Sequence, residues 1–214
     1  MKISRWLLLL LSGFLLLSGC QVKRNSDYFP LKVGNSWEYS LDFGASLVLT
    51  IPSTENIDGR ECFLADLAVK NGGPGCQRDE YFSSKEGIFL ARRIMQQGQT
   101  TITFNPPQKI LDNTLKPGAS WKWSGEIRTL GPGNSEEQKG DILTEVIGFE
   151  NIKTIKKTFN CCKIKVSGTI SPGVRLEEFK WYCDGVGLVK SQATLTVEGR
   201  RQATYVLLTS YTLK

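Results

Sequence analysis

Apolar and polar residues alternate along most of this chain, which is the pattern of half-buried β-strands. In the stretch "LVKSQATLTVEG", which begins at Leu188, the alternation is clear: one side carries Val189, Ser191, Ala193, Leu195 and Val197, and the other carries Lys190, Gln192, Thr194, Thr196 and Glu198. The turn signal "EGRR" follows. A last strand is then predicted over residues 202–213, with Ala203, Tyr205, Leu207, Tyr211 and Leu213 on its apolar side.

The same pattern predicts ten earlier strands, at residues 36–43, 46–52, 61–69, 78–83, 87–94, 99–104, 120–128, 141–149, 157–168 and 174–183. Turn signals such as "SKEG", "GPGN" and "SPG" separate them. Only residues 106–116 suggest a turn of helix. Strands joined by short turns predict an all-β fold, a curved antiparallel meander with very little helix that forms a half-barrel or an open barrel. We expect one domain over residues 29–214.

One phrase is written twice: "LKVGNSWEYS" begins at Leu31 and "LKPGASWKWS" at Leu115. Each copy has a glycine suited to a positive-φ turn and two aromatic residues on one side of a strand. These residues are Gly34, Trp37 and Tyr39 in the first copy, and Gly118, Trp121 and Trp123 in the second. We expect an apolar plug at the end of the curved sheet; a stacking platform for sugar rings is the alternative. The phrase resembles the Gly-x-Trp element of lipocalins, with one residue more between glycine and tryptophan.

The N-terminus reads as an export signal. Lys2 and Arg5 precede the apolar run "WLLLLLSGFLLL", which is too short for a membrane span and ends in "LSGC". This order resembles the signal and lipobox of bacterial lipoproteins, in which the cysteine thiol is diacylated and the new amine is acylated after cleavage. The resemblance implies a signal peptide at 1–19, lipidation of Cys20 and a lipidated tether at 20–28.

The resemblance also bears on location. Gln21, rather than Asp, follows the cysteine. Among lipoproteins of two-membrane bacteria this favours the outer membrane, and a host with one membrane would carry the protein on its surface. The expected partner is thus a membrane, held through the lipid anchor. Lys23 and Arg24 would lie beside it, either against anionic headgroups or as part of a solvated tether.

Composition narrows the candidate chemistry. The chain contains no histidine, which removes His-based nucleophile pairs, His metal sites and the usual general base. Its net charge of +6 falls by the charges of Lys2 and Arg5 after cleavage, too little to indicate nucleic acid. The adjacent acids Glu177–Glu178 and Glu136–Glu137 read as solvated charge, and Asp79–Glu80 splits across two faces. We expect no enzyme activity, catalytic residue, cofactor or metal.

Five cysteines follow Cys20, in a compartment that permits disulfides. Across the hairpin around "SPG", Cys162 or Cys161 faces Cys183, depending on where the turn is centred. Cys162 shares its side with apolar residues, as Cys183 does, so Cys162–Cys183 is the favoured pair and Cys161–Cys183 the second. Cys62 and Cys76 are further disulfide candidates, although a simple hairpin between them does not pair them.

Several phrases resemble, in order, a group of bacterial envelope lipoproteins of unknown function, the DUF3108-like group. The opening "FPLKVGNSW" and the closing "WYCDGVGLVKS" carry the likeness, which departs at Cys183 and Asp184. It implies a curved antiparallel sheet related to the LolA/LolB half-barrel, and no reaction. The closing glycines, Gly185 and Gly187, are not followed by a helix pattern, so we interpret them as a turn or bulge rather than a phosphate loop.

The sequence therefore predicts a membrane-anchored, non-enzymatic lipoprotein that binds an apolar ligand, such as a lipid, or an envelope protein partner. A structural β-domain with a filled core is the alternative, and an enzyme is the least favoured. The volume of the core separates the first two: an open apolar space of several hundred cubic ångströms favours a ligand.

Overall fold

The structure is a computed structural model, and it describes residues 26–70, 76–95, 99–171 and 173–214. The signal segment, Cys20 and the "NGGPG" turn lie outside these residues. Twelve β-strands follow one another: β1 Ser36–Leu41, β2 Ser46–Ile57, β3 Arg60–Val69, β4 Gln77–Ser84, β5 Gly87–Met95, β6 Thr100–Leu111, β7 Ser120–Gly131, β8 Asn134–Lys153, β9 Thr158–Ser171, β10 Val174–Cys183, β11 Gly187–Val197 and β12 Arg200–Thr212.

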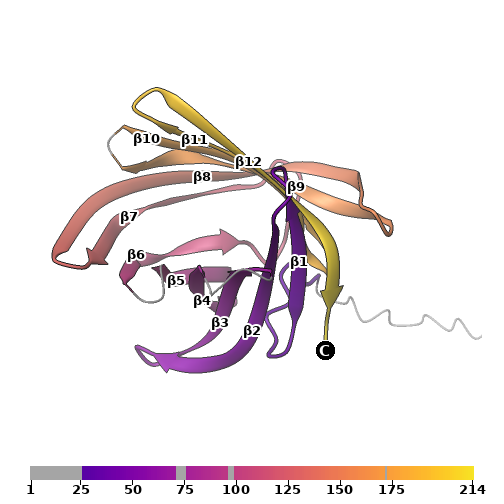
Figure 1. The fold of residues 1–214 in the computed structure, drawn as a ribbon, viewed down its shortest axis with the longest axis horizontal. Helices are drawn as coiled ribbons and strands as arrows, with labels where there is room; N and C mark the ends of the chain where they lie inside the picture. Colours follow the sequence, from indigo (N-terminus) through magenta and orange to yellow (C-terminus); the bar gives the residue numbers. More distant parts are fainter. Residues whose placement is uncertain (1–25, 71–75, 96–98, 172) are drawn as a thin grey trace, which may run out of the picture.

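Each strand pairs antiparallel with its neighbours in sequence, and β1 pairs with β12, so the sheet closes into a barrel. Figure 1 shows this seam, where the indigo first strand lies beside the yellow last one. The all-β antiparallel prediction is confirmed, and the sheet is more closed than the half-barrel or open barrel expected. Closure leaves none of the twelve described strands at a free sheet edge.

Every predicted strand has a counterpart, but the helical turn predicted at 106–116 is wrong. Strand β6 continues through this segment to Leu111. Residues Gln108, Lys109 and Leu111 pair with β5 across two shifts in register. Hydrogen bonding to a neighbouring strand thus decides the conformation of a segment whose local signals are ambiguous.

The apolar side predicted for the last strand is also wrong over part of its length. Val206, not Tyr205 or Leu207, lines the interior of the barrel, and Leu208 is buried. The register between β1 and β12 shifts between Glu38 and Tyr39, which moves the following residues to the other face.

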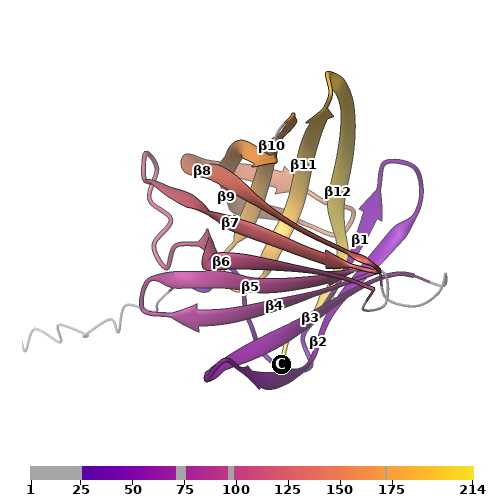
Figure 2. The same cartoon turned by 90° about the vertical axis from the view of Figure 1, so that its left-hand side faces the viewer.

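Because the strands alternate in direction, successive connections lie at opposite ends of the barrel wall. Figure 2 shows the barrel from the side that faces left in Figure 1. We call one end the mouth; it carries the β1–β2, β7–β8 and β11–β12 turns. The other is the N-terminal end; it carries the entering segment from Ser26, together with the β4–β5, β6–β7, β8–β9 and β10–β11 connections.

Phe29 closes the N-terminal end of the barrel from within. Its ring packs edge-on against Tyr81 at 5.3 Å between centroids and lies near Trp37 and Tyr182 at 6.2 and 6.4 Å. These three partners come from β4, β1 and β10, on different sides of the barrel. Phe29 itself is 7% exposed, so the segment before β1 forms a floor beneath the interior.

Candidate functional site

A cavity of about 540 Å³ runs inside the barrel from Phe29 toward the mouth. Its volume lies within the range of about 300–1,000 Å³ that is usual for small-molecule sites. Two of its walls are mainly apolar. Strands β6 to β9 contribute Ile102, Phe104, Ile110, Ile127, Ile142, Val166 and Ile170, and strands β12 to β3 contribute Val206, Leu47, Leu49, Ala65 and Leu67.

Between these walls, the buried carboxylate of Asp79 forms an ion pair with Arg93 on the neighbouring strand, whose side chain is 33% exposed. The guanidinium binds the carboxylate through both oxygens, at 2.7 and 2.8 Å. Tyr81 donates its hydroxyl to Asp79 Oδ2 at 2.7 Å, and Gln77 donates Nε2 to Oδ1 at 3.0 Å. Burial lowers the pKa of Arg93, but Asp79 outweighs that effect, so the pKa lies above its ordinary value. Four donors and one full counter-charge therefore hold this carboxylate in the cavity wall.

A second charge pair, Glu178 with Lys180 on β10, lines the opposite wall. The Lys180 ammonium lies 3.1 Å from Glu178 Oε2, and Ser191 donates its hydroxyl to Oε1 at 2.7 Å. Burial lowers the pKa of Lys180, and the Glu178 carboxylate more than offsets this, so the net direction is upward. Strands β4 and β10 lie half-way around the ring from one another. The two pairs together form a polar belt with no net charge, which separates the two apolar walls.

Three tyrosines also line the cavity: Tyr39, Tyr81 and Tyr182. Burial raises the pKa of each above its ordinary value. All three therefore stay neutral to a higher pH than an exposed tyrosine does. Tyr39 also reaches the carbonyl of Leu188 at 3.3 Å.

The repeated phrase forms the same turn twice. The backbone N–H of Gly34 donates to Ile51 O at 2.8 Å, and Asn35 O accepts from Ile51 N at 3.0 Å. In the second copy Gly118 and Ala119 exchange the equivalent bonds with Val146, both at 2.8 Å.

Both glycines have positive φ, 92° at Gly34 and 83° at Gly118. Each copy thus binds its own strand, β1 or β7, to the strand that follows it.

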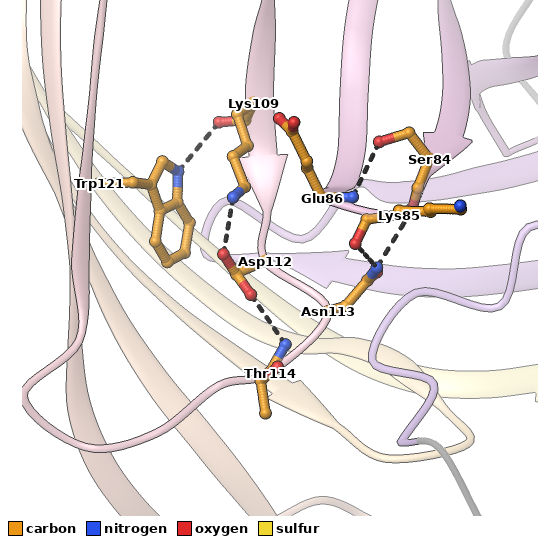
Figure 3. A network of polar contacts seen from close by, with 8 residues as sticks. All are labelled: Ser84, Lys85, Glu86, Lys109, Asp112, Asn113, Thr114 and Trp121. Carbon is orange, nitrogen blue, oxygen red and sulfur yellow. Dashed lines mark hydrogen bonds and ion pairs between the residues drawn. The ribbon is translucent and has the colours of Figure 1, made fainter.

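The aromatic residues of both phrases bond to main-chain carbonyls. Trp37 donates to Val186 O, and Trp123 donates to Pro106 O at 2.9 Å. Trp121 donates to Lys109 O at 3.2 Å within the network of Figure 3, where the Lys109 ammonium also binds Asp112 at 2.6 Å. In the same network Asn113 donates to the carbonyls of Ser84 and Lys85 and joins the β6–β7 connection to the β4–β5 turn. Trp37 and Trp123 are buried and Trp121 is partly buried, which is the arrangement that an apolar plug requires; the sugar-stacking alternative stays a prediction.

The opening and closing phrases of the chain lie in direct contact. Asp27 N donates to Asp184 Oδ1 at 2.6 Å, and Gly185 N donates to Asp27 O at 2.8 Å. Gly187 has a φ of 100°, and a β-carbon there would lie 3.3 Å from the Trp37 indole nitrogen. The glycines of the closing phrase thus allow a tight turn against the N-terminal segment.

The disulfide joins Cys161 to Cys183, so the favoured Cys162–Cys183 pair is wrong and the second candidate pair is the one formed. The register between β9 and β10 shifts by one residue beyond Val174, which brings Cys161 opposite Cys183. Cys62 and Cys162 are buried free thiols, and Cys76 is an exposed one. Burial raises the pKa of Cys162 to about 11.

Sequence reasoning missed the polar belt. Glu178, expected to be solvated, faces the cavity, and Asp79 and Glu80 are both buried. Glu80 pairs with Arg92, at 2.7 Å, on the other face of the sheet. A usable signal was present: each acid lies two residues from a tyrosine or lysine on the same side of its strand. Within the described residues, no group of three or more acidic or cysteine side chains is arranged to hold a metal, and no helix could span a membrane.

No family model matches the chain, and no curated protein matches it in sequence. Solved structures do match in fold. A protein from Bacteroides fragilis, described as exported and of YmcC-like fold, superposes with a TM-score of 0.55 at 16% identity, over 88% of this chain and 100% of its own. The hypothetical lipoprotein YmcC from Escherichia coli gives 0.50 at 10% identity, over 85% and 89%. The chain therefore has the fold of YmcC-like barrels.

Proposed function

We propose that this protein is a non-enzymatic bacterial envelope lipoprotein, anchored through Cys20, whose barrel holds an amphiphilic ligand. The cavity beneath the mouth carries this proposal. It is open over about 540 Å³, whereas a purely structural domain would fill that volume with its own side chains. The lipobox and the fold shared with proteins named as exported or as lipoproteins support the location, with the outer membrane as the expected site.

The polar belt favours a particular kind of ligand. Its two carboxylates and two cations already neutralise one another. A ligand with a net charge would bury that charge without a partner, which is costly. An apolar body with an uncharged or zwitterionic polar group fits best, with the chain along the isoleucine wall and the polar group near Tyr81, Tyr182 and the belt.

Native mass spectrometry of the protein, extracted gently from its host's envelope, tests this function. We expect a co-purifying lipid-sized mass that organic extraction removes. Ile142→Trp should abolish it by filling the cavity. Leu143→Trp is the matched control, because Leu143 is the next residue on β8 and is 39% exposed. An apo mass for the unaltered protein, repeated after incubation with host lipids, would leave the structural β-domain as the function.

A further inference from the structure

The connection between β8 and β9 holds an isoleucine out into solvent. Ile155 is 83% exposed, the highest value among the large exposed hydrophobic residues of the described chain. The turn around it is closed by Thr154, whose N–H and hydroxyl both donate to Lys157 O at 2.9 Å. The hydroxyl oxygen also accepts the Lys157 N–H at 3.3 Å. The side chain is therefore presented by a defined turn.

The rest of this hairpin is fixed to the barrel. Ile152 and Phe159, which face one another across the hairpin, are 7% and 8% exposed within the cluster that contains Trp181 and the disulfide. Lys157 donates its ammonium to the hydroxyl of Tyr211 on β12 at 2.8 Å. The hairpin projects beyond the other strands on the right of Figure 1. Ile155 thus lies at the tip of a rigid projection.

Positive charge surrounds this tip. Lys153 and Lys156 flank Ile155, are exposed, and form no ion pair with any described residue. The nearest acid along the strand, Glu150, is engaged by the indole of Trp181 and by Lys163. Glu38 on β1, which interacts electrostatically with Lys156, is itself paired with Lys70 at 2.9 Å. An exposed apolar side chain between these two lysines complements the surface of a membrane that contains anionic lipids.

The position of the hairpin agrees with the place where the chain enters the fold. Asp27 is bonded to the β10–β11 turn, at the same end of the barrel as Ile155. The six Cα-to-Cα steps from Cys20 to Ser26 span at most about 22 Å when extended. A strand as long as β11, tilted as in barrels, gives a height of about 28 Å. A lipid on Cys20 would therefore bring the N-terminal end, rather than the mouth, to the bilayer.

We infer that the Ile155 tip is a second membrane contact, with Ile155 entering the headgroup region and Lys153 and Lys156 binding anionic lipid. The orientation rests on the lipid anchor of the proposed function; the contact itself rests on the hairpin. The mouth would then point away from the membrane that carries the protein.

Site-specific photocrosslinking tests this contact. The purified full chain is mixed with vesicles of phosphatidylethanolamine and phosphatidylglycerol, with p-benzoylphenylalanine at position 155 or, as the control, at position 43. Phe43 is 73% exposed at the mouth, so the photoreactive side chain is readily accessible at the control position too. We expect several-fold more lipid adduct at position 155, reduced by Lys153→Glu together with Lys156→Glu. The mass of the peptide containing Cys20 reports lipidation in the same samples.

Each outcome decides a different point. Adduct at 155 without lipid on Cys20 supports the hairpin contact and refutes the anchor. Lipid on Cys20 with equal or greater adduct at position 43 overturns the hairpin contact and leaves the anchor intact. Neither lipid on Cys20 nor excess adduct at 155 refutes both. Circular dichroism of each variant checks that the barrel is retained.

Discussion

The indole of Trp37 donates its hydrogen to the main-chain oxygen of Val186 at 2.6 Å, across 149 residues of sequence. Trp37 is fully buried, and this bond joins the first strand to the turn between β10 and β11. The plug of the barrel and the contact between the two ends of the chain are therefore one structure.

Replacing Trp37 with Phe should destabilise the barrel. The variant keeps a ring but leaves the Val186 oxygen without its donor, which costs about 1–3 kcal/mol for a buried group. Trp121→Phe is the control, since its indole makes the equivalent kind of bond in a partly exposed place. Urea unfolding should show the larger loss for Trp37→Phe, and equal losses would contradict the role given to this bond.

The polar belt predicts that replacing the carboxylate of Asp79 with an amide destabilises the barrel. Asp79→Asn removes the counter-charge of Arg93 and leaves a buried carboxamide in place of a carboxylate that is only 6% exposed, so it should lower the free energy of unfolding by about 1.5–3 kcal/mol. Asp66→Asn breaks a pair with the same bidentate geometry, Arg78–Asp66, whose side chains are 42% and 32% exposed. Its loss should stay below about 1 kcal/mol. Denaturant midpoints of the two variants separate these values, and similar losses would show that the cavity wall is well hydrated.

The disulfide predicts that a bonded cysteine and a free cysteine differ in how much their replacement lowers the stability of the barrel. Cys183→Ser opens a link across 22 residues and should cost about 3 kcal/mol. Cys76→Ser, at an exposed free thiol, should cost little. Peptide mapping without reduction should recover Cys161 linked to Cys183 and Cys162 as a free thiol. Recovery of Cys162 linked to Cys183 would overturn the register of β9 and β10.

The buried tyrosines and Lys180 predict unfolding in alkali. Their folded pKa values are raised, so their contribution to stability is complete below a pH of about 10, where the unfolded groups begin to lose protons. It is lost as the pH rises further, because the unfolded chain then releases protons that the folded chain retains. Urea midpoints should fall above that pH, with a shallower fall for Tyr182→Phe. A midpoint independent of pH up to about 11 would argue against their burial.

Strand positions were predictable because they depend on local alternation and on turns. Only neighbouring residues were needed to predict the two sides of β11 near Val189 and the presence of a hairpin around "SPG". Closure of the barrel was not predictable in this way, since the pairing of Ser36 with Thr212 depends on twist accumulated over every strand.

The errors in detail have one physical source, which is irregular register. A single shift beyond Val174 exchanged Cys162 for Cys161 as the partner of Cys183, and another near Tyr39 changed which face of β12 is internal. Side parity did not correct the cysteine choice, because both faces of the sheet are buried there: Cys162 packs in the barrel and Cys161 packs beneath the β8–β9 hairpin. The belt escaped notice because its two ion pairs, Asp79–Arg93 and Glu178–Lys180, are distant in sequence and line one cavity only in the closed barrel.

The seam between β1 and β12 also has a consequence for the chain before its last strand is in place. Until Arg200–Thr212 has been made and delivered, β1 and β11 each present an unpaired edge able to join another chain. Contacts this far apart in sequence form slowly. A chain delivered from its N-terminus would therefore remain an open, aggregation-prone sheet until its last strand arrives. A chaperone would be needed most during that interval.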